Sequence, residues 1–170
     1  MPTLHVSSLS KLNETVAAVG ASHVVTLINA ATVVETPPGI AADRHLMLVM
    51  SDITSEMDGH VIPASEHVER LLGFVRDWDR QNPIVVHCWA GISRSTAGAY
   101  IAVCALRPEQ DEGEIAERLR ILSPSATPNA RLVALADEIL GRGGRMRAAI
   151  ERIGRGADAF EGKPFRFDLD

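Results

Sequence analysis

Cysteine is scarce in this chain, which has only two among 170 residues, Cys88 and Cys104. If one of them is a nucleophile, no disulfide framework of the kind that stabilises small secreted domains is available. The chain also lacks an apolar run near the roughly 20 residues that cross a bilayer. Its first residues lack the basic segment and apolar segment of a signal peptide. These absences predict a cytoplasmic protein with no membrane segment.

Charge of one sign is not strongly in excess, because the formal net charge is −5 at pH 7. This acidic balance argues against a general nucleic-acid binder, although a local cup can be positive on an acidic protein. A hydrophobic content of 46% over 170 residues is typical of one globular domain with a real core. No cluster of histidines and carboxylates with metal-ligand spacing is present, so we expect no metal and no cofactor.

The most informative stretch is residues 87–95, His-Cys-Trp-Ala-Gly-Ile-Ser-Arg-Ser. Apolar residues 84–86 before it predict a short buried strand, and residues 96–106 after it predict a buried helix. A loop between a strand end and a helix start directs backbone N–H groups inward and adds the positive helix terminus, which predicts an anion site. Gly91 permits the tight turn, and Arg94 offers donors for two phosphate oxygens. Such surroundings favour the thiolate of Cys88.

This stretch resembles the signature loop of the protein tyrosine phosphatases, in which five residues separate a cysteine from an arginine. The additional matches make it most similar to the dual-specificity branch, and the chain also resembles small tyrosine phosphatases of the bacterial type. These matches are His87, Ala90, Gly91, Ser93 and Ser95. The order of predicted elements extends the resemblance to roughly residues 3–140.

The resemblance implies roles for the loop and its neighbours. Cys88 is the expected nucleophile, which forms a cysteinyl-phosphate, and Arg94 holds phosphate oxygens together with the loop N–H groups. The loop residues expected at the phosphate are Trp89, Ala90, Gly91, Ile92 and Ser93. Ser95 would stabilise the thiolate as it leaves, or would be an ordinary serine at a helix start. His87 and Asn129 would support the loop, with a plain polar residue as the alternative for Asn129.

The expected general acid is an aspartate on the loop of residues 51–59. Asp52 directly follows a predicted strand, as the acid does in the family, whereas Asp58 better matches the family's spacing to the next helix. We favour Asp52, because a strand end is the more rigid support. Trp89 would either flank the substrate pocket or pack under a neighbouring loop.

The remaining elements alternate between strand and helix. Strands are predicted at residues 4–6, 24–28, 44–50 and 84–86. Helices are predicted from a Ser7 or Ser8 cap to Gly20, from Pro63 to 78, over 96–106, from a capping box at Asp111 and Glu114, and from Thr127–Pro128 to 139. This alternation predicts an α/β three-layer sandwich, with a mostly parallel central sheet flanked by helices and the phosphate-binding loop between a central strand and a buried helix. Residues 1–155 would form the catalytic domain, and residues 156–170 a C-terminal tail.

The function expected from the resemblance is a metal-independent phosphatase for phosphotyrosine, with dual specificity as a further possibility. A phosphorylated protein or peptide would be the partner, with phosphate or another oxyanion in the site and neither nucleic acid nor membrane. The alternatives are a catalytically weak phosphate-binding module and an inositol-phosphate phosphatase. Highly anionic substrates usually draw extra basic residues, which Trp89, Ile92 and Ser93 do not supply. The arginines of residues 141–155 indicate either a solvated helix end or a patch for an acidic partner.

Overall fold

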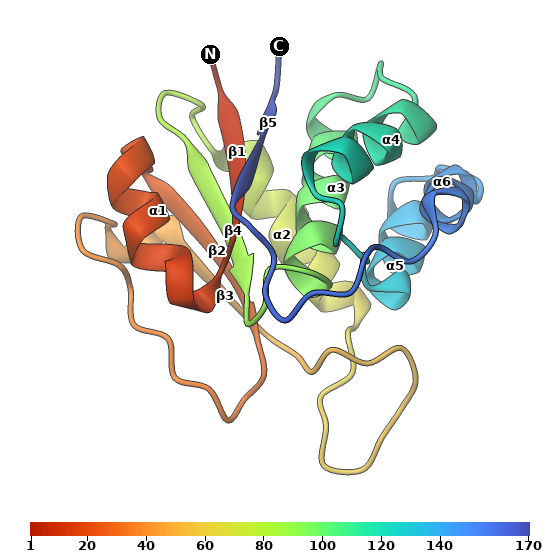
Figure 1. The fold of residues 1–170 in the computed structure, drawn as a ribbon, viewed down its shortest axis with the longest axis horizontal. Coiled ribbons are helices and arrows are strands. Elements are labelled where there is room, and N and C mark those ends of the chain that lie inside the picture. The colour runs from red at the N-terminus through yellow and green to blue at the C-terminus, as the bar shows by residue number, and fades with distance from the viewer.

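The computed structural model describes residues 1–170 as one five-stranded sheet with helices on both faces (Figure 1). The strand order is β3-β2-β4-β1-β5, and only β5 is antiparallel to its neighbour. The strands are β1 (Thr3–Ser8), β2 (His23–Ile28), β3 (His45–Val49), β4 (Ile84–Cys88) and β5 (Phe165–Asp168). The predicted α/β sandwich with a mostly parallel sheet is therefore confirmed, with β4 at its centre.

The helices divide unequally between the two faces of the sheet. Helix α1 (Leu12–Val19), preceded by a short 3-10 helix (Leu9–Lys11), covers one face (Figure 1). The other helices cover the opposite face: α2 (Ser65–Asp77), α3 (Arg94–Leu106), α4 (Glu112–Leu122), α5 (Ala130–Ile139) and α6 (Arg145–Ile153). A second 3-10 helix (Ala42–Arg44) precedes β3. None of the helices is both long and apolar enough to cross a membrane.

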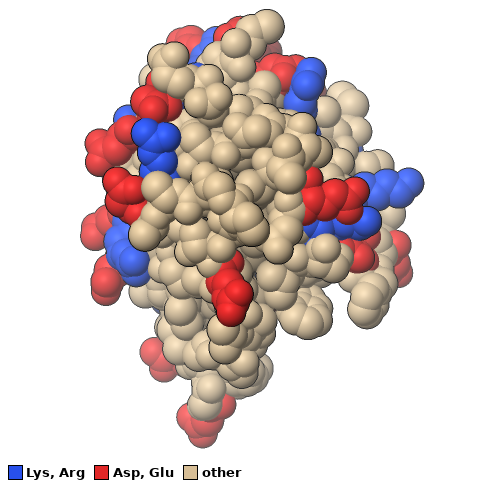
Figure 2. Space-filling view, turned by 90° about the vertical axis from the view of Figure 1, so that its left-hand side faces the viewer, with Lys and Arg blue, Asp and Glu red and all other residues tan.

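The hydrophobic core reflects this division. The larger cluster lies between the sheet and helices α2 to α6, and helix α3 is its most completely buried element. A smaller cluster lies under α1 and consists of Leu12, Val16, Val24, Ile40 and Val85. Viewed from the α1 side, the surface carries Lys, Arg, Asp and Glu mainly along its edges (Figure 2). Both signs of charge appear there, so this face presents no basic patch.

The beginnings of two helices differ from the sequence prediction. Ser8 precedes the 3-10 helix without a side-chain capping bond, and the α-helix itself starts only at Leu12. The Ser8 hydroxyl instead donates to the carboxylate of Glu161, in the C-terminal part of the chain. Pro63 lies two positions before α2, whose first residue is Ser65. The prediction that Pro63 occupies the first helical turn is therefore wrong.

The predicted N-terminal cap of α4 is confirmed, and the predicted cap of α5 is wrong. Asp111 caps α4 as predicted, since its carboxylate accepts from the N–H groups of Gly113 and Glu114 at 2.8 and 3.2 Å. The cap of α5 is Asn129, whose Oδ1 accepts from Leu132 N at 3.0 Å, and not Thr127. The Thr127 hydroxyl lies before the helix, where it donates to Ser125 O at 3.2 Å and accepts from Gly156 N at 3.1 Å.

The C-terminal residues contribute more regular structure than the sequence analysis indicated. Residues 141–155 contain α6, and residues 156–170 end in β5, which pairs with β1. The alternation of Phe165 and Phe167 with Arg166 was the strand signal, and Phe167 is fully buried. Both termini lie side by side at the same edge of the sheet (Figure 1).

Candidate active site

The signature loop, residues 88–94, connects the end of β4 to the start of α3. Cys88 is the last residue of the strand and is only 2% exposed. Its Sγ lies 3.1 Å from the hydroxyl of Ser95, which is fully buried. A serine hydroxyl at this distance can accept from a thiol and donate to a thiolate, so it can serve both forms of the sulfur.

Gly91 allows the loop to pack directly against β1. Its φ is 71°, in the left-handed region that favours glycine. A Cβ on Gly91 would lie 2.9 Å from Ser8 N and 3.0 Å from the carbonyl carbon of Ser7. Neither backbone group can rotate away, so both the conformation and the space at this position require glycine.

Arg94 begins α3 with its guanidinium almost entirely buried. The side chain is held by one protein contact, in which Nη1 donates to Met50 O at 2.9 Å. Its Nε is buried and has no hydrogen-bond partner in the protein. A buried donor on a charged group is costly when unpaired. The group is therefore suited to an acceptor that comes from outside the chain, such as an anionic oxygen.

Asp52 accepts two hydrogen bonds at one oxygen, one of them from the signature loop. The hydroxyl of Ser93 and Nδ2 of Asn129 donate to its Oδ1 at 2.7 and 2.9 Å. Asn129 N also donates to Ser93 O at 3.1 Å, and Asn129 Nδ2 to Ile53 O at 3.2 Å. One asparagine thus connects the start of α5, the loop after β3 and the signature loop.

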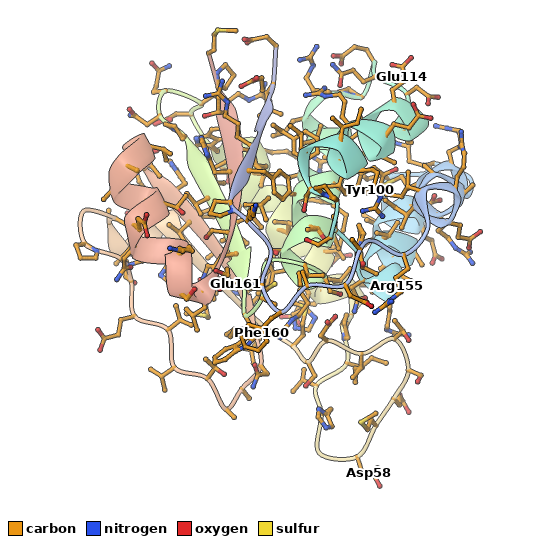
Figure 3. The ribbon with its side chains drawn as sticks, in the orientation of Figure 1. Asp58, Tyr100, Glu114, Arg155, Phe160 and Glu161 are labelled. Carbon is orange, nitrogen blue, oxygen red and sulfur yellow. The ribbon has the colours of Figure 1, made fainter.

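The two candidate aspartates lie in different places. Asp52 lies immediately beyond β3 and beside Ser93, whereas Asp58 lies at the tip of the extended loop after β3 and points away from the sheet (Figure 3). A cavity of about 390 Å³ separates the loops that follow β2 and β3, and both Asp52 and Arg94 line it. The side chain of His60, which also lines this cavity, contacts the Ser51 hydroxyl at 3.1 Å.

His87 lies on the central strand β4. Its ring is hydrogen-bonded to the backbone carbonyl of Cys88, the first residue of the signature loop. Burial lowers the pKa of His87 to about 4, so its ring is neutral at pH 7. Because the Cys88 carbonyl can only accept, Nδ1–H donates to it at 3.2 Å, which leaves Nε2 to accept from Thr26 Oγ1 at 2.7 Å. The same hydroxyl then accepts from Nε2–H of His45 at 2.7 Å. This chain of hydrogen bonds fixes the tautomer of His87.

Cys104 lies in α3, one of the most buried parts of the protein. Both cysteines are free, and burial raises the pKa of the Cys104 thiol to about 12. Its carbonyl accepts from Arg142, which also pairs with the buried Glu112 at 2.9 Å. Cys104 and its neighbours therefore belong to the framework behind α3. No group of three or more His, Cys, Asp or Glu side chains is arranged to hold a metal ion.

The C-terminal segment covers the outer side of the signature loop. We call residues 155–164 the strap. Its Gly162 N donates to Ala90 O at 2.8 Å, and Glu161 accepts from the hydroxyls of Ser8 and Ser10. A Cβ on Gly162 would lie 2.6 Å from Gly91 O. Phe160 and Glu161 accordingly lie near the carboxyl end of β4 (Figure 3).

The chain is similar to known proteins in one segment of its sequence and in its fold. Residues 54–124, which include the signature loop, match the family model for protein-tyrosine phosphatase. No curated protein matches the chain. Among solved structures, DUSP15 is similar with 19% identity, covering 89% of this chain and 92% of that chain at a TM-score of 0.62.

Two human structures are similar to the same extent. Human DUSP28 has 17% identity, with 88% of this chain and 94% of that chain covered at a TM-score of 0.62. The human tyrosine phosphatase-like serine/threonine/tyrosine-interacting protein has 16% identity, with 82% and 92% covered at a TM-score of 0.64. The fold is therefore that of the dual-specificity phosphatases, and the central segment of the chain has the sequence pattern of the protein tyrosine phosphatases. Asp52 and Asn129 lie outside that matched segment.

Proposed function

We propose that this protein is a cysteine-dependent phosphatase of the protein tyrosine phosphatase superfamily. It would hydrolyse phosphotyrosine in proteins or peptides without a metal or cofactor, and a phosphoseryl peptide tests dual specificity as a further activity. The observation that carries the proposal is a buried cysteine at a strand end, 3.1 Å from the Ser95 hydroxyl, beside an arginine with a buried unpaired donor. A phosphate dianion over the loop supplies the acceptor that Arg94 Nε lacks.

In the first chemical step, the Cys88 thiolate attacks phosphorus and the bond to the leaving oxygen breaks. The loop N–H groups and Arg94 hold the equatorial oxygens, where negative charge resides in the transition state. Asp52 gives a proton to the leaving oxygen. Both hydrogen bonds to Asp52 reach Oδ1, so Oδ2 is the oxygen that carries this proton.

In the second step, water attacks the cysteinyl-phosphate and the sulfur leaves. Asp52, now ionised, takes a proton from the water. The Ser95 hydroxyl donates to the thiolate as it forms, which its distance of 3.1 Å from Sγ supports. His87 acts through the Cys88 carbonyl and is a positioning residue, with Asn129 in the same role for Asp52.

The assignment of the acid is tested with two single substitutions. Asp52→Ala should lower kcat for phosphotyrosine about a hundredfold, the usual contribution of a general acid. Asp58→Ala should stay near wild type, because Asp58 points away at the tip of its loop (Figure 3). Phosphate release measured for both variants decides the assignment. A large loss in Asp58→Ala with wild-type kcat in Asp52→Ala would assign the proton to Asp58 instead.

The reaction itself is tested with a panel of substrates. Wild type and Cys88→Ser are compared on p-nitrophenyl phosphate, phosphotyrosyl and phosphoseryl peptides, and inositol phosphates. We expect wild type to hydrolyse the aryl phosphate and the phosphotyrosyl peptide, and Cys88→Ser to hydrolyse none. No turnover of any substrate by wild type, with phosphate analogues still bound, would favour a phosphate-binding module. A preference for inositol phosphates would favour that alternative, although Trp89, Ile92 and Ser93 are not basic.

A further inference from the structure

The strap, residues 155–164, holds a large apolar side chain in water beside the signature loop. Its backbone is fixed at both ends, since Ala157 N donates to Pro124 O at 2.9 Å and Gly162 N donates to Ala90 O at 2.8 Å. Between these bonds Phe160 is 92% exposed. Figure 3 shows Phe160 close to the carboxyl end of β4. A single exposed apolar side chain is ordinary on a protein surface, so what matters is whether a second one lies beside it.

A second exposed aromatic side chain, that of Trp89, lines a cavity together with Phe160. Trp89 is 55% exposed, and the cavity has a volume of about 200 Å³. Leu9 and Ala90 complete its apolar lining, with Ser10 and Glu161 at its polar edge. The Glu161 carboxylate is already engaged by the hydroxyls of Ser10 and Ser8, which lower its pKa. The walls available for contact are therefore mainly apolar.

A second cavity that Phe160 also lines has a different character. This cavity, of about 400 Å³, is lined by Arg155 and Asp158, whose side chains form an ion pair at 2.6 Å. Ile92 and Thr127 also line this cavity. An apolar group therefore gains most on the Trp89 side of Phe160, where it avoids displacing water from a pair of charges.

The apolar cavity borders the signature loop, two of whose residues line it. Trp89 and Ala90 are the two residues that directly follow Cys88, so the cavity begins at the rim of the signature loop. In a peptide, neighbouring Cα atoms are about 3.8 Å apart. When the phosphate of a peptide lies on the loop, the residues next to the phosphorylated residue lie over the surface around the loop, which this cavity borders.

We propose that Trp89 and Phe160 form a subsite for an apolar side chain adjacent to the phosphorylated residue of a peptide substrate. The proposal rests on the proposed function, because the phosphate on the signature loop places the peptide. It makes Phe160 a specificity-determining residue supplied by the strap. An arginine next to the phosphorylated residue is the competing occupant, since a guanidinium could stack on Trp89 near Glu161.

The test measures peptide binding in the Cys88→Ser background, so that it does not depend on turnover. Phosphotyrosyl peptides carry Leu, Ser or Arg on either side of the phosphotyrosine and are otherwise identical, and fluorescence anisotropy gives their Kd values. We expect the Leu peptide of one series to bind about tenfold more tightly than its Ser counterpart, as expected for burial of one aliphatic side chain. Phe160→Ala should abolish this preference. Ile121→Ala, which removes another exposed side chain (79%) on α4, should retain it.

Three outcomes would overturn the subsite: no preference for Leu in either series, a preference for Arg, or a Leu preference that survives in Phe160→Ala. Hydrolysis of p-nitrophenyl phosphate by the wild-type protein tests the proposed function separately. A protein that hydrolyses this small substrate but shows no Leu preference is a phosphatase without the subsite. A protein that shows the preference without hydrolysis has the subsite and lacks the activity.

Discussion

The contact between the strap and the signature loop predicts that Gly162→Ala is destabilising. The new Cβ would lie 2.6 Å from Gly91 O and 3.3 Å from Gly91 C, which are backbone atoms that cannot rotate aside. The strap must move away, which breaks the bond from Gly162 N to Ala90 O at 2.8 Å. The lost hydrogen bond costs about 1 kcal/mol and the crowding about 1–3 kcal/mol. We therefore expect the free energy of unfolding to fall by about 2–4 kcal/mol.

Urea denaturation of the wild type and two glycine variants tests this value. Gly73→Ala is the matched control, because Gly73 lies within α2 and a Cβ there meets no atom within 4 Å. That substitution should raise the free energy of unfolding, by up to about 1 kcal/mol, through helix propensity. If Gly162→Ala stays within about 0.5 kcal/mol of the wild type, as surface substitutions usually do, the close packing of strap and loop is refuted.

Further predictions concern the second chemical step, acid stability and the framework behind α3. Ser95→Ala should slow hydrolysis of the cysteinyl-phosphate about a hundredfold, seen as a burst of leaving group followed by slow turnover; turnover without a burst would contradict the role of Ser95. Burial lowers the pKa of His87 from 6.5 to about 4, so between these two pH values the unfolded chain binds a proton on His87 that the folded chain does not. Stability present above pH 6.5 should then be lost as the pH falls to about 4, by up to about 3 kcal/mol, and His87→Gln should show a flatter dependence in urea titrations; equal slopes would refute this. Glu112→Ala leaves the buried Arg142 without its carboxylate partner, so calorimetry should show a loss of about 3–5 kcal/mol, and an unchanged Tm would contradict the role of this pair.

The central part of the fold could be predicted from local patterns. A β-branched apolar run indicates β4, and a long apolar stretch indicates α3. The signature loop between them is indicated by a cysteine, a glycine and an arginine in fixed order. These elements are buried on both faces, so their sequences carry a strong and continuous apolar signal. Strands β1 and β2 are also largely buried and fall where the sequence places them. The edge strand β3 is mostly half-buried, yet it also falls where its apolar residues predict.

The parts that escaped prediction depend on contacts between distant residues. Phe165 and Phe167 alternate with Arg166 over only four residues of strand, too short a pattern to stand out at the end of a chain. The strap has no periodicity, because Gly162 is positioned by the carbonyl of Ala90 rather than by its own neighbours. Likewise, the spacing along the chain between Asp52 and Asn129 gives no indication that Asn129 donates to Asp52 at 2.9 Å.

The most direct test of the account is to trap the covalent intermediate. The wild-type protein is mixed with a phosphotyrosyl peptide, quenched in acid within the first turnovers, digested and analysed by mass spectrometry. We predict one phosphoryl group on the peptide that contains Cys88, a larger amount of it in Ser95→Ala, and none in Cys88→Ser. Hydrolysis by Cys88→Ser, or wild-type turnover with the phosphoryl group on another residue, would contradict the account.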